Sequence, residues 1–252
     1  MSTPVFYDEL SRYYHLIYAD WEASIDRQAR ALDSIIRTEG GPEPHTILDC
    51  TCGIGTQSLG LAARGYEVTA SDLSPATVER ARLEARQRGL SLQVSVADMR
   101  SLYKHHGRTF DVVLSCDNSV PHLLSNEDIL TALRQFYKCT KVGGLCLVSL
   151  RDYSAMDFNS QIQLHPYGVR DVGDVRYVLF QVWDLKPPLY DTTFYVIEQQ
   201  GSSPATVHST KSTYYAVTIP VIIQLMEEAQ FQDVRRIEDV FFQPIIVGHK
   251  RK

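Results

Sequence analysis

Hydrophobic and polar residues follow two different spacings along the first part of the chain. Over residues 5–38, apolar residues recur at helical spacing in two segments. After the Gly- and Pro-rich stretch 40–46, short apolar runs alternate with helical patterns. The pattern predicts strands over 47–51, 66–70, 92–96, 110–116 and 145–150, helices over 56–64, 75–88 and 127–139, and a turn over 141–144. This alternation indicates a parallel sheet covered by helices on both faces.

The pattern changes after residue 150. Three stretches of alternating apolar residues follow one another without a helical pattern between them, at 175–185, 192–200 and 207–217. Direct strand-to-strand connections of this kind predict an antiparallel layer. The core pattern then returns, with a helix over 219–228 and strands over 233–239 and 240–250.

We therefore expect an α/β fold with a doubly wound, mostly parallel, seven-stranded Rossmann-like sheet. Residues 42–151 and 218–252 are expected to form this core. Residues 1–41 would form an N-terminal helical cap. Residues 152–217 would form an antiparallel β insertion after the fifth strand, and this insertion would cover the substrate pocket.

The length and charge of the chain indicate which kinds of partner to expect. A chain of 252 residues with 44% hydrophobic residues is expected to form one core with an elaboration. The net charge is −5, and the basic residues gather only in the short tail HKRK, which argues against a nucleic-acid partner and favours a small-molecule substrate. No apolar run has the length of a membrane span or a signal peptide, so we expect a cytoplasmic protein without a membrane partner. The sequence leaves homo-oligomer formation open.

The cysteines do not predict a disulfide framework or a metal site. Their number, five, is odd, and no secretion signal is visible, so free thiols are expected. Cys50 and Cys52 are close in sequence, but no second pair of Cys or His residues completes a tetrahedral set. We expect both to be small residues packed beneath a loop.

The stretch 47–57 carries the clearest candidate chemistry. A buried strand ends at Asp49 and opens into a turn that contains Gly53 and Gly55. Glycine permits positive φ and lets a ligand approach the backbone closely. The helix that follows presents free N–H groups at its start. The segment therefore predicts a ligand site at the carboxyl end of the first strand.

Two further acids follow the neighbouring strands. Asp72 lies roughly 20 residues beyond the glycines, where an acid is placed to accept hydrogen bonds from both ribose hydroxyls of a nucleoside. Asp98 and Met99 follow the third strand and could hold the edge and face of an adenine. A nicotinamide site is an alternative, but its glycine motif requires glycine at Ser58. A plain structural α/β layer is the other alternative.

The end of the fourth strand is polar although apolar residues flank it. Asp117, Asn118, Ser119 and His122 gather there. They could form a helix-entry loop capped by Asn118 or Ser119, or they could line the reaction site. His122 could act as a base or make a structural hydrogen bond.

The ordered set of three acids and two glycines resembles the class I S-adenosylmethionine-dependent methyltransferases. The set consists of Asp49, Gly53, Gly55, Asp72 and Asp98. Four segments, IYADW, ILDCTCGIGT, CDNSVPHL and SLRDYS, are similar to stretches of glycine N-methyltransferase and the glycine/sarcosine/dimethylglycine methyltransferases. The resemblance covers most of residues 7–155 and is faint afterwards.

This resemblance implies the cofactor and its binding residues. The cofactor would be S-adenosyl-L-methionine, held by residues at the matching positions: Asp49, Thr51, Gly53, Gly55, Asp72, Leu73, Asp98, Met99 and Cys116. Two positions depart from the family pattern. Thr51 stands where the family has the first glycine of its loop, and Val142 stands where it has a proline before the glycine pair.

The resemblance also implies residues for the substrate. In that family, the arginine just after the fifth strand holds the substrate carboxylate, and it matches Arg151. A salt bridge to Asp152 is the alternative role for this arginine. The family's asparagine near the amine matches Asn118, and its N-terminal tyrosine matches Tyr18.

The expected function is methyl transfer from S-adenosylmethionine to a small molecule, in the first place to the amine of a glycine-like amino acid. This transfer is an in-line displacement, in which the protein aligns the reactants and excludes water. Aromatic residues of the cap and insertion suit a cationic product: Tyr18, Trp21, Trp183, Tyr214 and Tyr215. Two alternatives stay open, namely an O-methyltransferase acting on a small carboxylate or phenol, and a non-catalytic S-adenosylmethionine-binding regulatory protein.

Overall fold

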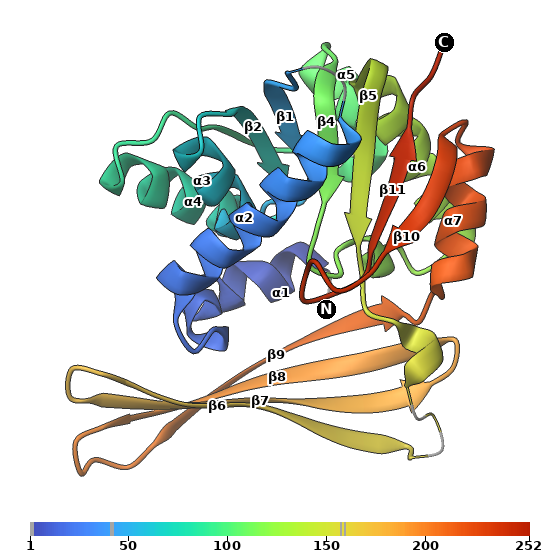
Figure 1. Ribbon diagram of the computed structural model, residues 1–252. Coiled ribbons are helices and arrows are strands. Elements are labelled where there is room, and N and C mark those ends of the chain that lie inside the picture. The colour runs from blue at the N-terminus through green and yellow to red at the C-terminus, as the bar shows by residue number, and fades with distance from the viewer. Residues whose placement is uncertain (1–2, 41–42, 157, 159) are drawn as a thin grey trace.

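The computed structural model of the protein describes residues 3–40, 43–156, 158 and 160–252. Its centre is a seven-stranded sheet with the order β10-β11-β5-β4-β1-β2-β3 (Figure 1). These strands are β1 Thr46–Asp49, β2 Glu67–Asp72, β3 Gln93–Val96, β4 Phe110–Ser115, β5 Thr140–Ser149, β10 Gln232–Ile237 and β11 Ile245–His249. β1 to β5 pair in parallel, whereas β11 is antiparallel to both of its neighbours. The predicted fold class is confirmed.

Helices cover both faces of this sheet. The helices are α1 Thr3–Leu10, α2 Trp21–Glu39, α3 Thr56–Ala63, α4 Pro75–Gln87, α5 Leu102–His106, α6 Asn126–Cys139 and α7 Ile219–Glu228. Alternate residues of β1 show how the faces are filled, because Ile47 packs with α2 and α3 while Leu48 packs with α6 and α7. Both side chains are fully buried. A strand buried on both faces explains the continuous apolar runs in the sequence.

A second sheet lies beyond the carboxyl ends of the central strands (Figure 1). It is a four-stranded antiparallel sheet made of β6 Ile162–Val172, β7 Val175–Lys186, β8 Leu189–Gln200 and β9 Thr206–Tyr215. The three predicted strands correspond to β7, β8 and β9, whereas β6 was not predicted. The apolar side chains of β6, such as Leu164 and Val169, are exposed, and its pairing with β7 is irregular between Pro166 and Gly168. The first residues of β6 alternate between apolar and polar, but the apolar side chains face away from the core.

Two other predicted boundaries also differ from the structure. The turn expected over 141–144 is part of β5, which starts at Thr140 and pairs with β4 through an irregular register. Gly144 allows this irregularity, because a Cβ there would lie 2.6 Å from the Asp111 carbonyl oxygen. The strand expected over 240–250 is shorter and spans only Ile245–His249. The short helix α5 was not predicted.

The N-terminal helices pack against both sheets. Phe6 and Leu10 of α1 form a buried cluster with Leu179 and Phe194 on the inner face of the four-stranded sheet. Phe6 and Tyr13 dock the cap in this way, whereas Tyr7, Tyr14 and Tyr18 line the cavity described below. The Asp8 carboxylate accepts hydrogen bonds from the Ser74 hydroxyl at 2.5 Å and the Ala76 N–H at 3.0 Å. α1 is thus fastened to the start of α4.

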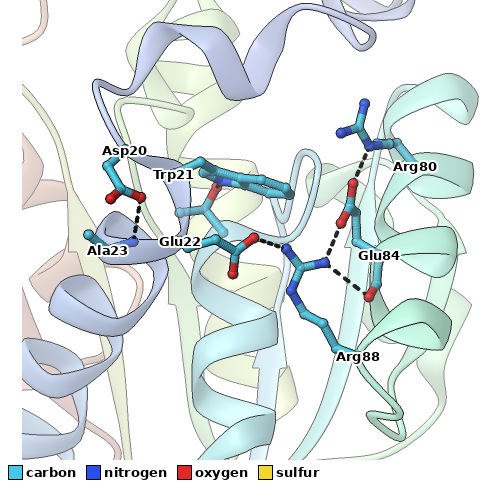
Figure 2. A network of polar contacts seen from close by, with 8 residues as sticks. Asp20, Trp21, Glu22, Ala23, Arg80, Glu84 and Arg88 are labelled. Atoms are coloured by element: carbon cyan, nitrogen blue, oxygen red, sulfur yellow. Dashed lines mark hydrogen bonds and ion pairs between the residues drawn. The ribbon is translucent and has the colours of Figure 1, made fainter. Parts of the chain in front are cut away.

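A polar network fixes the start of α2 (Figure 2). The Asp20 carboxylate caps the helix by accepting the Ala23 N–H at 2.9 Å. Trp21 donates its indole N–H to the Thr56 hydroxyl at 2.9 Å. Arg88 lies between Glu22 and Glu84, and its guanidinium carbon is 5.2 Å from the Trp21 ring centroid. The network ties α2 to α3 and α4 and holds the segment that contains Tyr18.

Within the described part of the chain, no helix combines the length and the apolar character that crossing a bilayer requires.

Candidate active site

A cavity of about 570 Å³ opens at the carboxyl ends of the central strands. The loops after β1, β2, β3 and β4 line it, and α1 contributes Thr3, Pro4 and Tyr7. Eight of the residues that the resemblance assigns to the cofactor or the substrate lie on its wall: Tyr18, Thr51, Gly53, Asp72, Leu73, Asp98, Met99 and Cys116. Asp49, Gly55, Asn118 and Arg151 are not part of this wall as the described residues define it.

The two glycines of the first loop have different roles. Gly53 has φ of +52°, lines the cavity, and would place a Cβ in open space. A side chain there would therefore occupy the volume available to a ligand. Gly55 has φ of +95° and lies behind the wall, where a Cβ would be 3.2 Å from the Leu59 side chain. Gly55 thus serves the turn and the packing of α3.

Asp72 is held in the wall with hydrogen-bonding capacity to spare. Its carboxylate accepts the Gly53 N–H at 2.8 Å, the Ser74 N–H at 2.9 Å and the Thr77 hydroxyl at 3.3 Å. A carboxylate offers about four lone-pair sites, so at least one remains for a ligand. Burial raises the pKa of Asp72, while these donors oppose the rise. The arrangement suits a neutral diol donor such as a ribose.

Asp49 lies beneath the loop. Its carboxylate accepts the Ser58 hydroxyl at 2.6 Å and the Thr51 N–H at 3.4 Å. Its exposure is 1%, and burial raises its pKa to about 7. Asp49 therefore supports the loop from below, and its role in holding a cofactor stays a prediction.

Asp98 and Met99 lie on the wall, but Asp98 already has a charged partner. Its carboxylate accepts the Arg100 N–H at 2.8 Å and the Arg100 guanidinium at 2.7 Å. Arg100 lowers the pKa of Asp98 more than burial raises it. A ligand edge would share this carboxylate with Arg100, which itself lines the cavity and was missed in the sequence.

The end of β4 turns sharply into the wall. Asp117 has φ of +59° and Asn118 has φ of +64°. Asp117, Ser119 and His122 line the cavity, whereas Asn118 points behind it, where its amide donates to the Tyr153 hydroxyl at 2.8 Å. Ser119 stands at the N-cap position of the short 3₁₀ helix Val120–Leu123, but its hydroxyl donates to the Cys116 carbonyl at 2.9 Å and makes no capping bond. α6 is capped by Ser125, which accepts the Asp128 N–H at 3.2 Å.

Tyr18 and Arg151 lie on either side of this turn. The Tyr18 hydroxyl donates to the Asp117 carboxylate at 3.4 Å. Arg151 lies in a separate cleft, with its guanidinium carbon 4.7 Å from the Trp183 ring centroid. The alternative salt bridge to Asp152 is absent, because Asp152 pairs with Arg236 at 2.7 Å. Among the described residues, no carboxylate forms an ion pair with Arg151.

His122 joins three segments of the chain. Its Nε2 lies 2.8 Å from the Tyr7 hydroxyl, and its Nδ1 lies 3.3 Å from the Ser212 hydroxyl. Burial lowers the pKa of His122 to about 3, so the imidazole is neutral near pH 7. No sequence pattern marks Tyr7 as a wall residue, because its partner His122 is distant along the chain.

The comparisons with known proteins agree with this geometry. Residues 47–144 match a family model described as a methyltransferase domain. A glycine/sarcosine N-methyltransferase of Parasynechococcus marenigrum (strain WH8102) is 33% identical over 139 residues, which are 54% of this chain and 49% of that relative. Residues 47–144 therefore carry a methyltransferase domain, and the relatives support its placement among the class I S-adenosylmethionine-dependent methyltransferases.

Other relatives of the chain carry different names. A ubiquinone biosynthesis O-methyltransferase of Alkalilimnicola ehrlichii is 29% identical over 147 residues, which are 56% of this chain and 58% of that relative. DesVI of Streptomyces venezuelae has a TM-score of 0.79 with 17% identity over 90% of this chain and 92% of that chain, a likeness that shows the fold. The chain spans about half the length of the curated relatives it matches.

S-adenosylmethionine, the cofactor of this methyltransferase family, fits the residues present. Gly53 leaves open space at the wall, and Asp72 offers a free acceptor beside it. Within the described ranges, no three His, Cys, Asp or Glu side chains are grouped so as to hold a metal ion. The five thiols are free and buried.

Proposed function

We propose that this methyltransferase transfers the methyl group of S-adenosylmethionine to the amine of a small, glycine-like amino acid. The observation that carries the proposal is Arg151, a guanidinium without a carboxylate partner among the described residues. Its backbone N–H donates to the Asn118 side chain at 3.1 Å, directly behind the cavity wall. Such a guanidinium is suited to a carboxylate ligand.

Tyrosines surround Arg151. Its charge opposes the rise that burial causes in the pKa values of Tyr167 and Tyr190. Arg151 also acts on the pKa of Asp117, which lines the cavity. An acceptor with a carboxylate near Arg151 would therefore direct its other end toward the β4 wall. The relatives named as glycine/sarcosine N-methyltransferases support an acceptor of this class.

The chain's own residues would align the reactants. The cofactor, when bound, supplies an electrophilic methyl group on a sulfonium. Gly53 and Asp72 would hold the nucleoside, and Arg151 would hold the acceptor carboxylate. Tyr18 would present its oxygen to the cation that forms on nitrogen. Alignment of two bound reactants and exclusion of water supply most of the rate enhancement expected of such a site.

A panel of acceptors tests this function. The protein is incubated with S-adenosylmethionine and glycine, sarcosine, dimethylglycine or related amines, and release of S-adenosylhomocysteine is measured. We expect release that depends on an amine, with the methyl group on nitrogen by mass spectrometry. O-methylation is the second candidate because a ubiquinone O-methyltransferase is among the relatives. Release only with an amine-free phenol or carboxylate would favour that candidate and contradict ours.

Replacing Arg151 with lysine tests the carboxylate anchor. Lysine keeps the charge but loses the planar pair of donors, so KM for the best amino acid of the panel should rise by about 10-fold. The affinity for S-adenosylhomocysteine should stay at the wild-type value, measured by calorimetry. Arg236→Lys is the matched control, because Arg236 pairs with Asp152 and Glu238 outside the cavity. An unchanged KM in Arg151→Lys removes the anchor.

A further inference from the structure

Asp117 has a left-handed backbone conformation, and this conformation does not require a charged side chain. Its φ of +59° lies in the left-handed region, where glycine is most at ease and Asn and Asp are tolerated. Ser149 fixes the turn, because its hydroxyl accepts the Asp117 N–H at 2.8 Å and its carbonyl accepts the Asn118 N–H at 3.1 Å. Asn118, at φ of +64°, shows that an amide side chain suits the same conformation. The backbone therefore does not explain a carboxylate at this position.

The Asp117 carboxylate is poorly satisfied within the protein. Its two hydrogen-bond donors, the Tyr18 hydroxyl and the Gln243 amide, are both at 3.4 Å. The carboxylates of Asp49 and Asp72, by contrast, accept bonds at 2.6 Å and 2.8 Å. No cation forms an ion pair with Asp117 among the described residues. Asp117 is half-buried at the cavity wall, where a carboxylate without close donors or a counter-ion is costly.

The groups that face Asp117 favour a cation beside it. Burial raises the pKa values of the phenols of Tyr7, Tyr14 and Tyr18, and the negative charge of Asp117 raises them further. These phenols are therefore neutral and present oxygen atoms. Burial also raises the pKa of Asp117, and Arg151 opposes this rise from the far side of the turn. This part of the cavity combines one acid with neutral oxygens, which suits an ammonium group.

We infer that Asp117 is the specificity-determining residue that binds the protonated amine of the acceptor. The inference rests on the proposed function, because it assigns the amine end of a ligand whose carboxylate end we assign to Arg151. The carboxylate of Asp117 and the guanidinium of Arg151, which form no ion pair with each other, would together recognise a small zwitterion. The ligand class is thus a primary or secondary amine with an anionic group close to it.

Asp117 also provides a place for the proton that the amine must lose. One N–H bond of the ammonium breaks, its electron pair stays on nitrogen, and the proton passes to an Asp117 oxygen. The lone pair then forms the bond to the methyl carbon, and the electron pair of the broken C–S bond goes to sulfur. Charge and atoms balance without any further reactant.

Replacing Asp117 with asparagine removes the charge while keeping the shape and the left-handed backbone. With the panel member that the wild type methylates best, KM should rise by about 10- to 100-fold, as loss of a charged hydrogen-bond partner implies. The Kd for S-adenosylhomocysteine should stay unchanged by calorimetry. Asp171→Asn is the matched control at an acid that pairs with Arg176 and lines neither the cavity nor the cleft of Arg151. Its KM should match the wild type.

Competition separates a binding role from a purely structural one. Glycine carries an amine where glycolate carries a hydroxyl. Their inhibition constants against the best acceptor should therefore differ in the wild type and become similar in Asp117→Asn. If that variant fails to fold, Asp117→Gly, which suits positive φ, should show the same convergence. A wild-type KM in a folded variant overturns the role of Asp117 and leaves the proposed function standing. Absence of amine methylation by the wild type overturns both.

Discussion

Replacing Asp72 with alanine is expected to weaken the binding of S-adenosylhomocysteine by about 100-fold or more. The change removes the carboxylate acceptor left for the ribose diol, and a hydrogen bond to a charged group contributes about 1.5 to 3 kcal/mol. It also removes the acceptor of the Gly53 N–H, which now lies at 2.8 Å. Titration calorimetry with S-adenosylhomocysteine measures the effect directly.

Two further variants show whether a loss of affinity for S-adenosylhomocysteine is due to the Asp72 carboxylate itself. Asp174→Ala removes an exposed acid from the turn between β6 and β7 and should bind S-adenosylhomocysteine as the wild type does. Asp72→Asn keeps an oxygen for the Gly53 N–H and should lose less affinity than the alanine variant. An Asp72→Ala protein that binds within about threefold of the wild type would contradict the assignment of Asp72 to the nucleoside.

Replacing Asp49 with asparagine should stabilise the free protein relative to the wild type, and this gain in the free energy of unfolding should be larger at pH 8 than at pH 5. Burial raises the pKa of Asp49 from 3.8 to about 7 in the folded protein. Between these values the folded state holds a proton that the unfolded chain has released, so the wild type loses stability as pH rises. The loss is about 1.4 kcal/mol per pH unit, or about 3 kcal/mol between pH 5 and pH 7.

Urea denaturation at the two pH values measures this difference. Asparagine can still accept the Ser58 hydroxyl, so its gain over the wild type should grow by about 3 kcal/mol from pH 5 to pH 8. Asp111→Asn is the control, because Lys141 and Thr46 hold the pKa of Asp111 well below its usual value despite burial. The Asp111 carboxylate is ionised in the folded and the unfolded state at either pH. The effect of Asp111→Asn on the free energy of unfolding should therefore be the same at pH 5 and pH 8. Equal effects of Asp49→Asn at pH 5 and pH 8 would show that Asp49 is ionised in the fold.

The central sheet was predictable because its strands are buried on both faces. Runs such as 110–116 stay apolar regardless of tertiary detail, and their flanking polar residues mark the ends. β6 was not predictable in this way, since its apolar side chains face outward and its inner side chains include Gln163 and His165. What placed β6 in the fold was pairing with β7, which the sequence of β6 alone does not reveal.

The sequence predicted those residues of the cavity wall that directly follow the parallel strands. Gly53 and Asp72 lie on it because parallel strands finish at one edge. Asn118 was named from a motif, yet the left-handed turn directs Asp117 to the cavity and Asn118 away from it. No periodicity encodes such a turn. The pairing of Asp98 with Arg100, by contrast, was available from their spacing of two residues.

The four-stranded sheet lies beyond the part of the chain that matches the family model. The match ends at residue 144, before this sheet begins at Ile162. Gly53 and Asp72, to which we assign the nucleoside, lie within the matched part, whereas Trp183, Tyr190 and Tyr214 come from the part beyond it. Arg151, to which we assign the acceptor carboxylate, lies against Trp183. We therefore expect substitutions in the four-stranded sheet to change which acceptor is used and to leave the affinity for the methyl donor unchanged.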